Sequence, residues 1–380
     1  MTDILLPTAR LIIADSEHDA DMLYAAGMFV PDAFIAIETD GIWHGLFSPL
    51  EVDRARKNSN FNHVYLDSPL RAAAENSGRS GLASIAAAFL DERSIKSVEV
   101  PGQFPFAYAE ALKSWGFEVR ASDGAFFPSR AVKTETEIKH LTHAEKLTRL
   151  SMMQAENYLA ACSIADDGIL RDGMSNKKVK AADVRRAIET FLIANGAMPA
   201  HTIVACGKQG ADPHNIGSGN IYAHQPIIID IFPRVLATGY WGDMTRTYVK
   251  GRATPEIKRL YNTVREGQDI GLSMVRDGAD GTRIHQSITN HFESRGFPTR
   301  MVRGKQTGFF HGTGHGVGLQ IHEAPGISSR PGILKTGQVV TVEPGLYYPG
   351  LGGVRIEDMV VVRDNGCDNL TRHKRKLVID

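Results

Sequence analysis

The chain has 380 residues, in which 43 Lys and Arg residues balance 43 Asp and Glu residues to a formal net charge of zero. This length suffices for two domains, or for one large domain with an appendage, each burying a core of its own. Because the charge is balanced and no long basic tract is present, we exclude nucleic acid as a partner.

The cysteines and the N-terminus indicate the cellular setting. Cys162, Cys206 and Cys367 are scattered and form no CxxC pair, so neither a disulfide framework nor a cysteine zinc site is indicated. Asp3 stands where a secretory signal would carry basic residues, and no run approaches the roughly 18 to 20 apolar residues of a membrane span. We therefore expect a soluble cytoplasmic protein that does not enter a membrane.

The first 132 residues alternate short apolar runs with helical patterns, which predicts a small α/β domain. The expected strands are 11–14, 33–37 and 97–100, and the expected helices are 49–57 and 82–92. The pattern breaks at 126–130, and Thr134 and Glu137 then fit the capping box that begins a helix. We therefore predict domains at 1–132 and 133–380.

The second part begins with helices and continues into strands. The expected order is helices at 134–161 and 181–195, strands at 226–230 and 242–249, helices at 255–276 and 284–295, and strands at 338–343 and 354–362. Turn residues after each first strand, Pro233 to Gly239 and the run 344–353, predict a hairpin for each strand pair. The predicted fold class is α+β, with two similar halves of antiparallel sheet and helices facing one site.

Potential metal ligands occur in the second part in the order Asp230, Asp243, His315, Glu343, Glu357. Each acid alone is more typical of an exposed strand or a turn. However, each predicted hairpin carries two of them, and strand alternation lets Glu343 and Glu357 point into one cleft. The roughly four negative charges of such a cluster would be balanced by two divalent cations, which suit an oxygen-rich set better than one tetrahedral zinc ion does.

Histidines separated by glycines lie in the run from His311 through His315 to His322. Glycines at this density indicate a backbone that approaches another group closely. The spacing matches neither phosphate-binding glycine motif, and the HExxH zinc motif is absent because Gly326 takes the place of its second histidine. Since no GxSxG motif is present and the cysteines lack motif context, the expected nucleophile is a water activated by metal.

Together these segments resemble the pita-bread metallopeptidases, the family of methionine aminopeptidase, aminopeptidase P and prolidase. The resemblance covers 135–380 and rests on Asp230, DMTRT at Asp243, HGTGHGVGLQIHE, VEPG at Glu343 and RIED at Glu357. The run DMLYAAGMFVPDAF also resembles the N-terminal domain of the creatinase, prolidase and aminopeptidase P branch, which methionine aminopeptidase lacks. The implied architecture is a pita-bread catalytic domain with a smaller N-terminal α/β domain.

The resemblance also implies a role for each site residue. One metal would be bound by Asp230, the other by His315 and Glu343, and both by Asp243 and Glu357. The implied catalytic residues are His214, His322 and Glu343, with Glu343 as general base, and the implied substrate-binding residues are His214, His311, His322 and Arg355. His224 lies nearer to Asp230 than His214 but fits less well. The run from Asp230 to Asp243 is two residues longer than the commonest family form, and Phe232 replaces a usual glycine.

The implied function is a dinuclear metallo-exopeptidase that hydrolyses Xaa-Pro bonds, either as an Xaa-Pro aminopeptidase or as an Xaa-Pro dipeptidase (prolidase). Manganese is the expected metal because carboxylate oxygens dominate the set, with cobalt or zinc as alternatives. The expected partners are a peptide or dipeptide with proline after the scissile bond, and a second copy of the chain in a homodimer. The alternatives are a hydrolase of another small C–N substrate, such as a creatine-like compound, a hydrolase of an organophosphorus compound, or a non-catalytic binding protein.

Overall fold

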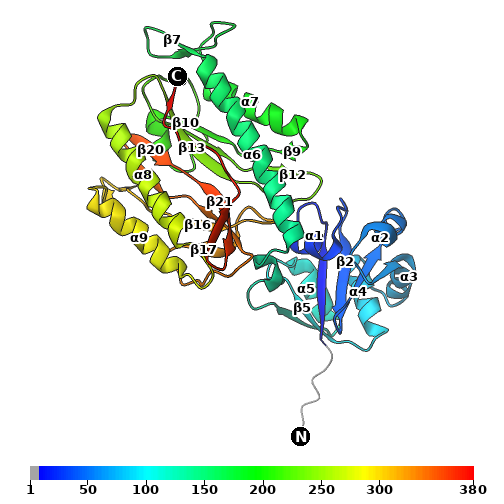
Figure 1. Ribbon diagram of the computed structural model, residues 1–380. Coiled ribbons are helices and arrows are strands. Elements are labelled where there is room, and N and C mark those ends of the chain that lie inside the picture. The colour runs from blue at the N-terminus through cyan, green and yellow to red at the C-terminus, as the bar shows by residue number, and fades with distance from the viewer. Residues whose placement is uncertain (1–7) are drawn as a thin grey trace. The chain divides into compact units, whose positions relative to one another are not determined.

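The computed structural model describes residues 8–380, so Asp3 and its neighbours lie outside the described part (Figure 1). The chain divides between Arg130 and Ala131 into an N-terminal unit and a C-terminal unit, with a short 3₁₀ turn, Pro128–Ala131, at the join. Between residues 8 and 380, no helix has both the length and the apolar character that a bilayer span requires.

The apolar runs of the N-terminal unit form one mixed sheet of six strands in the order β4-β3-β2-β1-β5-β6. Strand β2 pairs antiparallel with β1 and β3, whereas β1–β5, β5–β6 and β3–β4 are parallel. The elements are β1 (Thr8–Ala14), α1 (Ala20–Ala26), β2 (Phe34–Thr39), β3 (Ile42–Phe47), α2 (Val52–Asn58), β4 (His63–Leu66), α3 (Ser68–Asn76), α4 (Leu82–Asp91), β5 (Ser97–Val100), α5 (Phe106–Ser114) and β6 (Glu118–Ala121).

All five elements expected in the N-terminal unit are confirmed, as β1, β2, β5, α2 and α4. Sequence reasoning did not predict β3, β4, β6, α1, α3 and α5. Of these, β4 and β6 are four residues long and have no fully buried side chain, so no hydrophobic period marks them. Apolar side chains fill both faces of the sheet, with Leu11 and Ile13 on one face and Ile12 on the other.

The C-terminal unit has two similar halves, each a pair of helices followed by antiparallel strands. Helix α6 packs on α7 and α8 packs on α9, and strands such as β10, β13, β16 and β21 lie between the two pairs (Figure 1). The elements are α6 (Glu135–Ala161), β7 (Ser163–Ile164), β8 (Leu170–Arg171), α7 (Ala181–Ala194), β9 (Ala197–Met198), β10 (Ile203–Cys206), η2 (Gly207–Ala211), β11 (Ile227–Ile231), β12 (Arg234–Val235), β13 (Met244–Lys250), α8 (Pro255–Met274), α9 (Gly281–Ser294), β14 (Arg300–Val302), β15 (Lys305–Thr307), β16 (Gly314–Gly316), β17 (Glu323–Ile327), β18 (Val339–Val342), β19 (Gly345–Tyr348), β20 (Gly352–Arg355), β21 (Asp358–Arg363), β22 (Gly366–Asn369) and β23 (Val378–Ile379).

The two halves build separate sheets, β10-β11-β13-β23 and β17-β16-β18-β21-β22. In the first, the predicted hairpin is confirmed, since β11 pairs antiparallel with β13. The residues between these strands also form β12, which pairs with β9. The run from Asp230 to Asp243 therefore contains a short strand of its own.

The second predicted hairpin is partly wrong. Strand β18 does pair antiparallel with β21, but the run 344–353, expected as a turn, contains a further strand pair, β19 and β20. The expected strand 354–362 is broken at Ile356 and Glu357, which belong to no strand. Glycines at 345, 350, 352 and 353 favoured a turn in the sequence, whereas Leu346 and Tyr347, both fully buried, hold this segment against the core as strand β19.

The capping box predicted for helix α6 is confirmed. The Thr134 hydroxyl accepts a hydrogen bond from the Glu137 amide at 3.3 Å, and the Glu137 carboxylate accepts one from the Thr134 amide at 2.8 Å. We expect Thr134→Ala to lower the free energy of unfolding by about 1 kcal/mol, because it removes the hydroxyl that satisfies the Glu137 amide, which the helix leaves unpaired. Urea unfolding measures this change, and Thr134→Ser is the control that should retain most of the stability.

Candidate metal centre

The first two predicted ligands lie on the first hairpin. Asp230 is in β11 opposite Thr245 of β13, and Asp243 immediately precedes β13. Their neighbours Ile229, Ile231 and Met244 are fully buried and fix both strands in the core, so the carboxylates are carried inward and only 8% and 4% of the two residues is exposed.

The other two carboxylates come from the second half. Glu343 directly follows β18, and Glu357 lies between β20 and β21. The antiparallel register of β18 and β21 pairs Val342 with Asp358. Glu343, the residue after Val342, therefore comes opposite Glu357, the residue before Asp358. Glu357 is tied to the first hairpin twice, because its amide donates to Thr245 O at 3.1 Å and its Oε2 accepts from Thr245 Oγ1 at 2.7 Å.

The predicted imidazole ligand lies on β16, between β17 and β18. A side chain at Gly314 would place its Cβ 1.9 Å from the Thr341 carbonyl, so the close backbone approach expected from the glycines is confirmed. His315 Nδ1 lies 3.2 Å from the Gly316 carbonyl, a geometry in which Nδ1 carries the proton. His315 Nε2 is then free to bind a cation.

The structure brings these residues together. Ligand atoms of Asp243, His315 and Glu357 lie within 4.8 Å of one another. His315 Nε2 is also 3.6 Å from Asp243 Oδ2 and 3.5 Å from Glu343 Oε1. Asp230 Oδ2 accepts from Arg355 Nη2 at 2.7 Å, while its buried Oδ1 has no hydrogen-bond partner. A buried carboxylate oxygen without a donor is the kind of atom that a cation would satisfy.

The electrostatics of the cluster also fit a positively charged group. Burial, reinforced by the neighbouring carboxylates, raises the pKa of Asp243 and of Glu357 well above the usual range. Burial likewise raises the pKa of Glu343 to about 8, although Arg355 opposes the shift. Burial, with the adjacent His322, lowers the pKa of His315 to about 4, so its imidazole is neutral at pH 7, as a metal ligand must be.

Of the predicted substrate-binding histidines, His322 contacts the cluster directly. The rings of His315 and His322 meet edge to face with centroids 4.3 Å apart. The exposed His214 is close enough to lower the pKa of both His311 and His322, after burial, which is the larger cause for each. His224, the less favoured alternative to His214, instead accepts a hydrogen bond from the Arg252 amide through Nδ1 at 2.8 Å.

Arg355, expected at the substrate, lies inside a buried chain of hydrogen bonds. Its guanidinium donates to Asp230 Oδ2 and, at 3.0 Å, to the Tyr347 hydroxyl, which lies 2.9 Å from His311 Nε2. Arg355 also donates to the Pro213 carbonyl at 3.3 Å, which holds the loop that carries His214. Sequence reasoning did not find Tyr347, because it falls in the run expected as a turn.

Glu145 of α6 is a further carboxylate that the sequence analysis missed. It is fully buried, and its Oε2 accepts a hydrogen bond from the Asp243 amide at 2.9 Å. The close approach of α6 depends on Gly242, since a Cβ there would lie 2.3 Å from Thr148 Oγ1. A signal was available, because Leu141, Glu145, Thr148 and Met152 are spaced by four, three and four residues and so share the inner face of the helix.

We expect Glu145→Leu to weaken Mn²⁺ binding by about 10-fold, since groups that orient a metal ligand typically contribute this much. Glu145→Gln keeps a carbonyl oxygen that can accept from the Asp243 amide, and so it should bind Mn²⁺ nearly as the unaltered protein does. Calorimetric titration of both metal-free proteins makes the comparison. Equal weakening in the two variants would show that the negative charge, and not the hydrogen bond, matters.

Comparison with known proteins agrees with this arrangement. The model of metallopeptidase family M24 matches residues 156–364, which is more than half of the chain and includes all five predicted ligands. The chain belongs to metallopeptidase family M24. It is therefore a metallo-exopeptidase type of hydrolase, and its C-terminal unit is the pita-bread fold of the M24 enzymes.

Individual M24 relatives match over most of this chain. An uncharacterized peptidase of Bacillus subtilis, YqhT, is 28% identical over 363 residues, covering 88% of this chain and 98% of YqhT. An Xaa-Pro dipeptidase of Pyrococcus horikoshii is 32% identical over 292 residues, which is 75% of each chain. Among solved structures, an Xaa-Pro dipeptidase from Bacillus anthracis superimposes with a TM-score of 0.81 at 25% identity, covering 98% of this chain and 95% of that one.

Proposed function

We propose that this M24 enzyme is a dinuclear metallopeptidase that hydrolyses the bond before proline in Xaa-Pro peptides. The observation that carries the proposal is the convergence of Asp243, His315 and Glu357, with Glu343 and Asp230 beside them, from separate segments onto one buried site. The substrate class is supported by the relative of Pyrococcus horikoshii, whose name is Xaa-Pro dipeptidase.

Asp230 would hold one ion, His315 and Glu343 the other, and Asp243 and Glu357 both. The donor set is four carboxylates and one neutral imidazole, which favours Mn²⁺, with Co²⁺ or Zn²⁺ as alternatives. When bound, such a pair of ions supplies an activated water and a positive charge that stabilises the oxyanion of the tetrahedral intermediate.

The residues of the chain would handle the proton and the substrate. The Glu343 carboxylate, whose Oε1 lies 3.5 Å from His315 Nε2, would take a proton from the attacking water and return it to the leaving amine. His322 and His214 would contact the substrate around the scissile carbonyl. His311 would line the same site, with its Nε2 side fixed by the Tyr347 hydroxyl.

The proposal is tested by assaying the Mn²⁺-loaded enzyme with Xaa-Pro dipeptides and with longer peptides that begin Xaa-Pro. We expect metal-dependent release of the first residue, and matched peptides with alanine in place of proline are the control. Absence of cleavage of every Xaa-Pro substrate would refute the assignment, and cleavage of a creatine-like or organophosphorus compound would replace it. Light scattering of the same preparation tests the homodimer expected from the family resemblance.

A further inference from the structure

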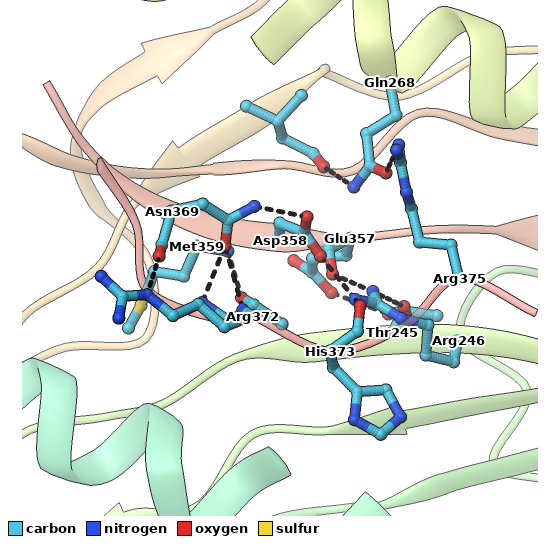
Figure 2. A network of polar contacts seen from close by, with 12 residues as sticks. Thr245, Arg246, Gln268, Glu357, Asp358, Met359, Asn369, Arg372, His373 and Arg375 are labelled. Carbon is cyan, nitrogen blue, oxygen red and sulfur yellow. Dashed lines mark hydrogen bonds and ion pairs between the residues drawn. The ribbon is translucent and has the colours of Figure 1, made fainter. Parts of the chain in front are cut away.

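Arg246 is a wholly buried cation that no proposed catalytic role uses. It lies on β13, its side chain is 0% exposed, and it is among the largest fully buried side chains of residues 8–380. It is next to Thr245, whose hydroxyl donates to the Glu357 carboxylate. Figure 2 shows Arg246 beside Glu357 and Asp358, and the ring of His373 pointing away from them.

One nitrogen of the guanidinium spans the junction between the two halves of the C-terminal unit. Arg246 Nη1 donates to the Glu357 carbonyl at 2.6 Å and to the Thr245 carbonyl at 2.9 Å. Glu357 lies outside any strand, so no regular ladder fixes its backbone on both sides. Arg246 therefore supplies a fixed donor at the residue where the strand is broken.

The other nitrogen anchors the next residue and the C-terminal segment. Arg246 Nη2 donates to Asp358 Oδ1 at 2.7 Å and to the His373 carbonyl at 3.0 Å. The second oxygen of Asp358 accepts from Asn369 Nδ2 at 2.7 Å (Figure 2). The segment from Asn369 to His373 thus closes a cage around the Arg246–Asp358 ion pair.

A gain in folding stability does not by itself explain why the Arg246–Asp358 ion pair is buried. A buried ion pair loses its hydration on folding, and replacing it with uncharged groups of similar size is often neutral or stabilising. The guanidinium does offer what an apolar group cannot, namely several donors in a rigid plane. Here those donors fix the backbone of Glu357 while Thr245 orients its carboxylate.

We propose that Arg246 is a positioning residue that holds Glu357 in place at the metal centre. Thr245 and Glu357 are linked directly by two hydrogen bonds, and Arg246 holds the carbonyls of both residues from the opposite side of the backbone. The inference rests on the proposed metal site and adds a residue that touches neither metal nor substrate. Its expected signature is a change in metal affinity and geometry beyond any change in stability.

The deciding variants separate positioning from loss of a buried charge partner. Arg246→Met leaves Asp358 unpaired, so it is studied together with the double variant Arg246→Met, Asp358→Asn, in which neither charge remains. Arg246→Lys keeps the charge, but a single ammonium group cannot reproduce the planar set of donors. Arg363→Met is the matched control, because Arg363 of β21 pairs with Asp368 at 2.7 Å and Glu135 at 3.1 Å and contacts no ligand.

Each metal-free protein is titrated with Mn²⁺ by calorimetry and with Co²⁺ by visible absorption, after circular dichroism shows that it is folded. We expect the double variant to bind the weaker of the two Mn²⁺ ions about 10- to 100-fold less tightly than the unaltered protein and to have a different Co²⁺ spectrum. Arg246→Lys should show an intermediate effect, and Arg363→Met should show no change in either measurement. The inference would be overturned if the double variant and Arg246→Lys were both folded and both kept the Mn²⁺ affinity and the Co²⁺ spectrum of the unaltered protein. If the double variant is unfolded, Arg246→Lys decides. An unaltered protein that binds no Mn²⁺ would instead refute the proposed metal site.

Discussion

Replacing Asp243 with asparagine is expected to lower kcat/KM for an Xaa-Pro peptide by roughly 10²–10³-fold, because Asp243 would hold the ions that stabilise the transition-state oxyanion. Asp243 belongs to the three-residue cluster whose ligand atoms lie within 4.8 Å of one another. Asparagine has nearly the same shape but lacks the negative charge. The change should therefore remove bound metal while leaving the fold in place.

Metal content per chain and cleavage rate are measured together for Asp243→Asn. The matched control is Asp53→Asn in the N-terminal unit, where the side chain is 83% exposed, and it should keep full metal content and activity. Retention of both properties by Asp243→Asn would show that the cluster is not the catalytic metal site.

The second large effect concerns the metal-free protein, which we expect to become less stable as the pH rises from about 7 to about 8, above the range in which histidines titrate in the unfolded chain. Burial raises the pKa of Asp243, Glu343 and Glu357 in the folded state, that of Glu343 to about 8. In the unfolded chain the same groups lose their protons near pH 4 to 4.5. In this interval each of these groups keeps its proton in the folded state and has lost it in the unfolded state, so each lowers the stability of the folded protein as the pH rises.

Scanning calorimetry of the metal-free protein at pH 7 and pH 8 tests this sign. The Tm should be lower at pH 8, and added Mn²⁺ should raise it more at pH 8 than at pH 7, because the cations offset the ionised carboxylates. Glu343→Gln is the control, since it removes one of the titrating groups and should flatten the dependence. A metal-free Tm that rises between pH 7 and pH 8 would contradict the expected crowding of carboxylates.

Long amphipathic helices and apolar strands could be predicted because their signals are local. Helix α6 has a capping box at Thr134 and Glu137 and a regular inner face, so its start is correct to one residue. The break at Glu357 could not be read, because Val354 to Val362 has the composition of one continuous strand. It is the pairing of β20 with β19 and of β21 with β18 that divides the run in two.

In the candidate site, too, the features with a local sequence signal could be predicted, whereas the contacts between distant residues could not. The residues Asp230, Asp243, His315, Glu343 and Glu357 were identifiable because each stands in a short distinctive motif. The contacts of Glu145 and Tyr347 were not: helical spacing marks Glu145 as an inner-face residue, but nothing in the local sequence shows that it contacts Asp243 or that Tyr347 contacts His311. Such contacts join residues 98 and 36 positions apart, respectively, and exist only once the sheets are packed.

The sequence by itself determined the family, the α+β class and the identity of the candidate ligands, because motif spacing and hydrophobic period are properties of neighbouring residues. The tertiary structure alone decided how those ligands are held. Arg246, Thr245 and Asn369 fix Glu357 and Asp358 through contacts that cross from the first hairpin to the second half and to the C-terminal segment. The physical reason is that a buried polar group acts through its partners, and the partners of a buried group are chosen by the packing of distant segments.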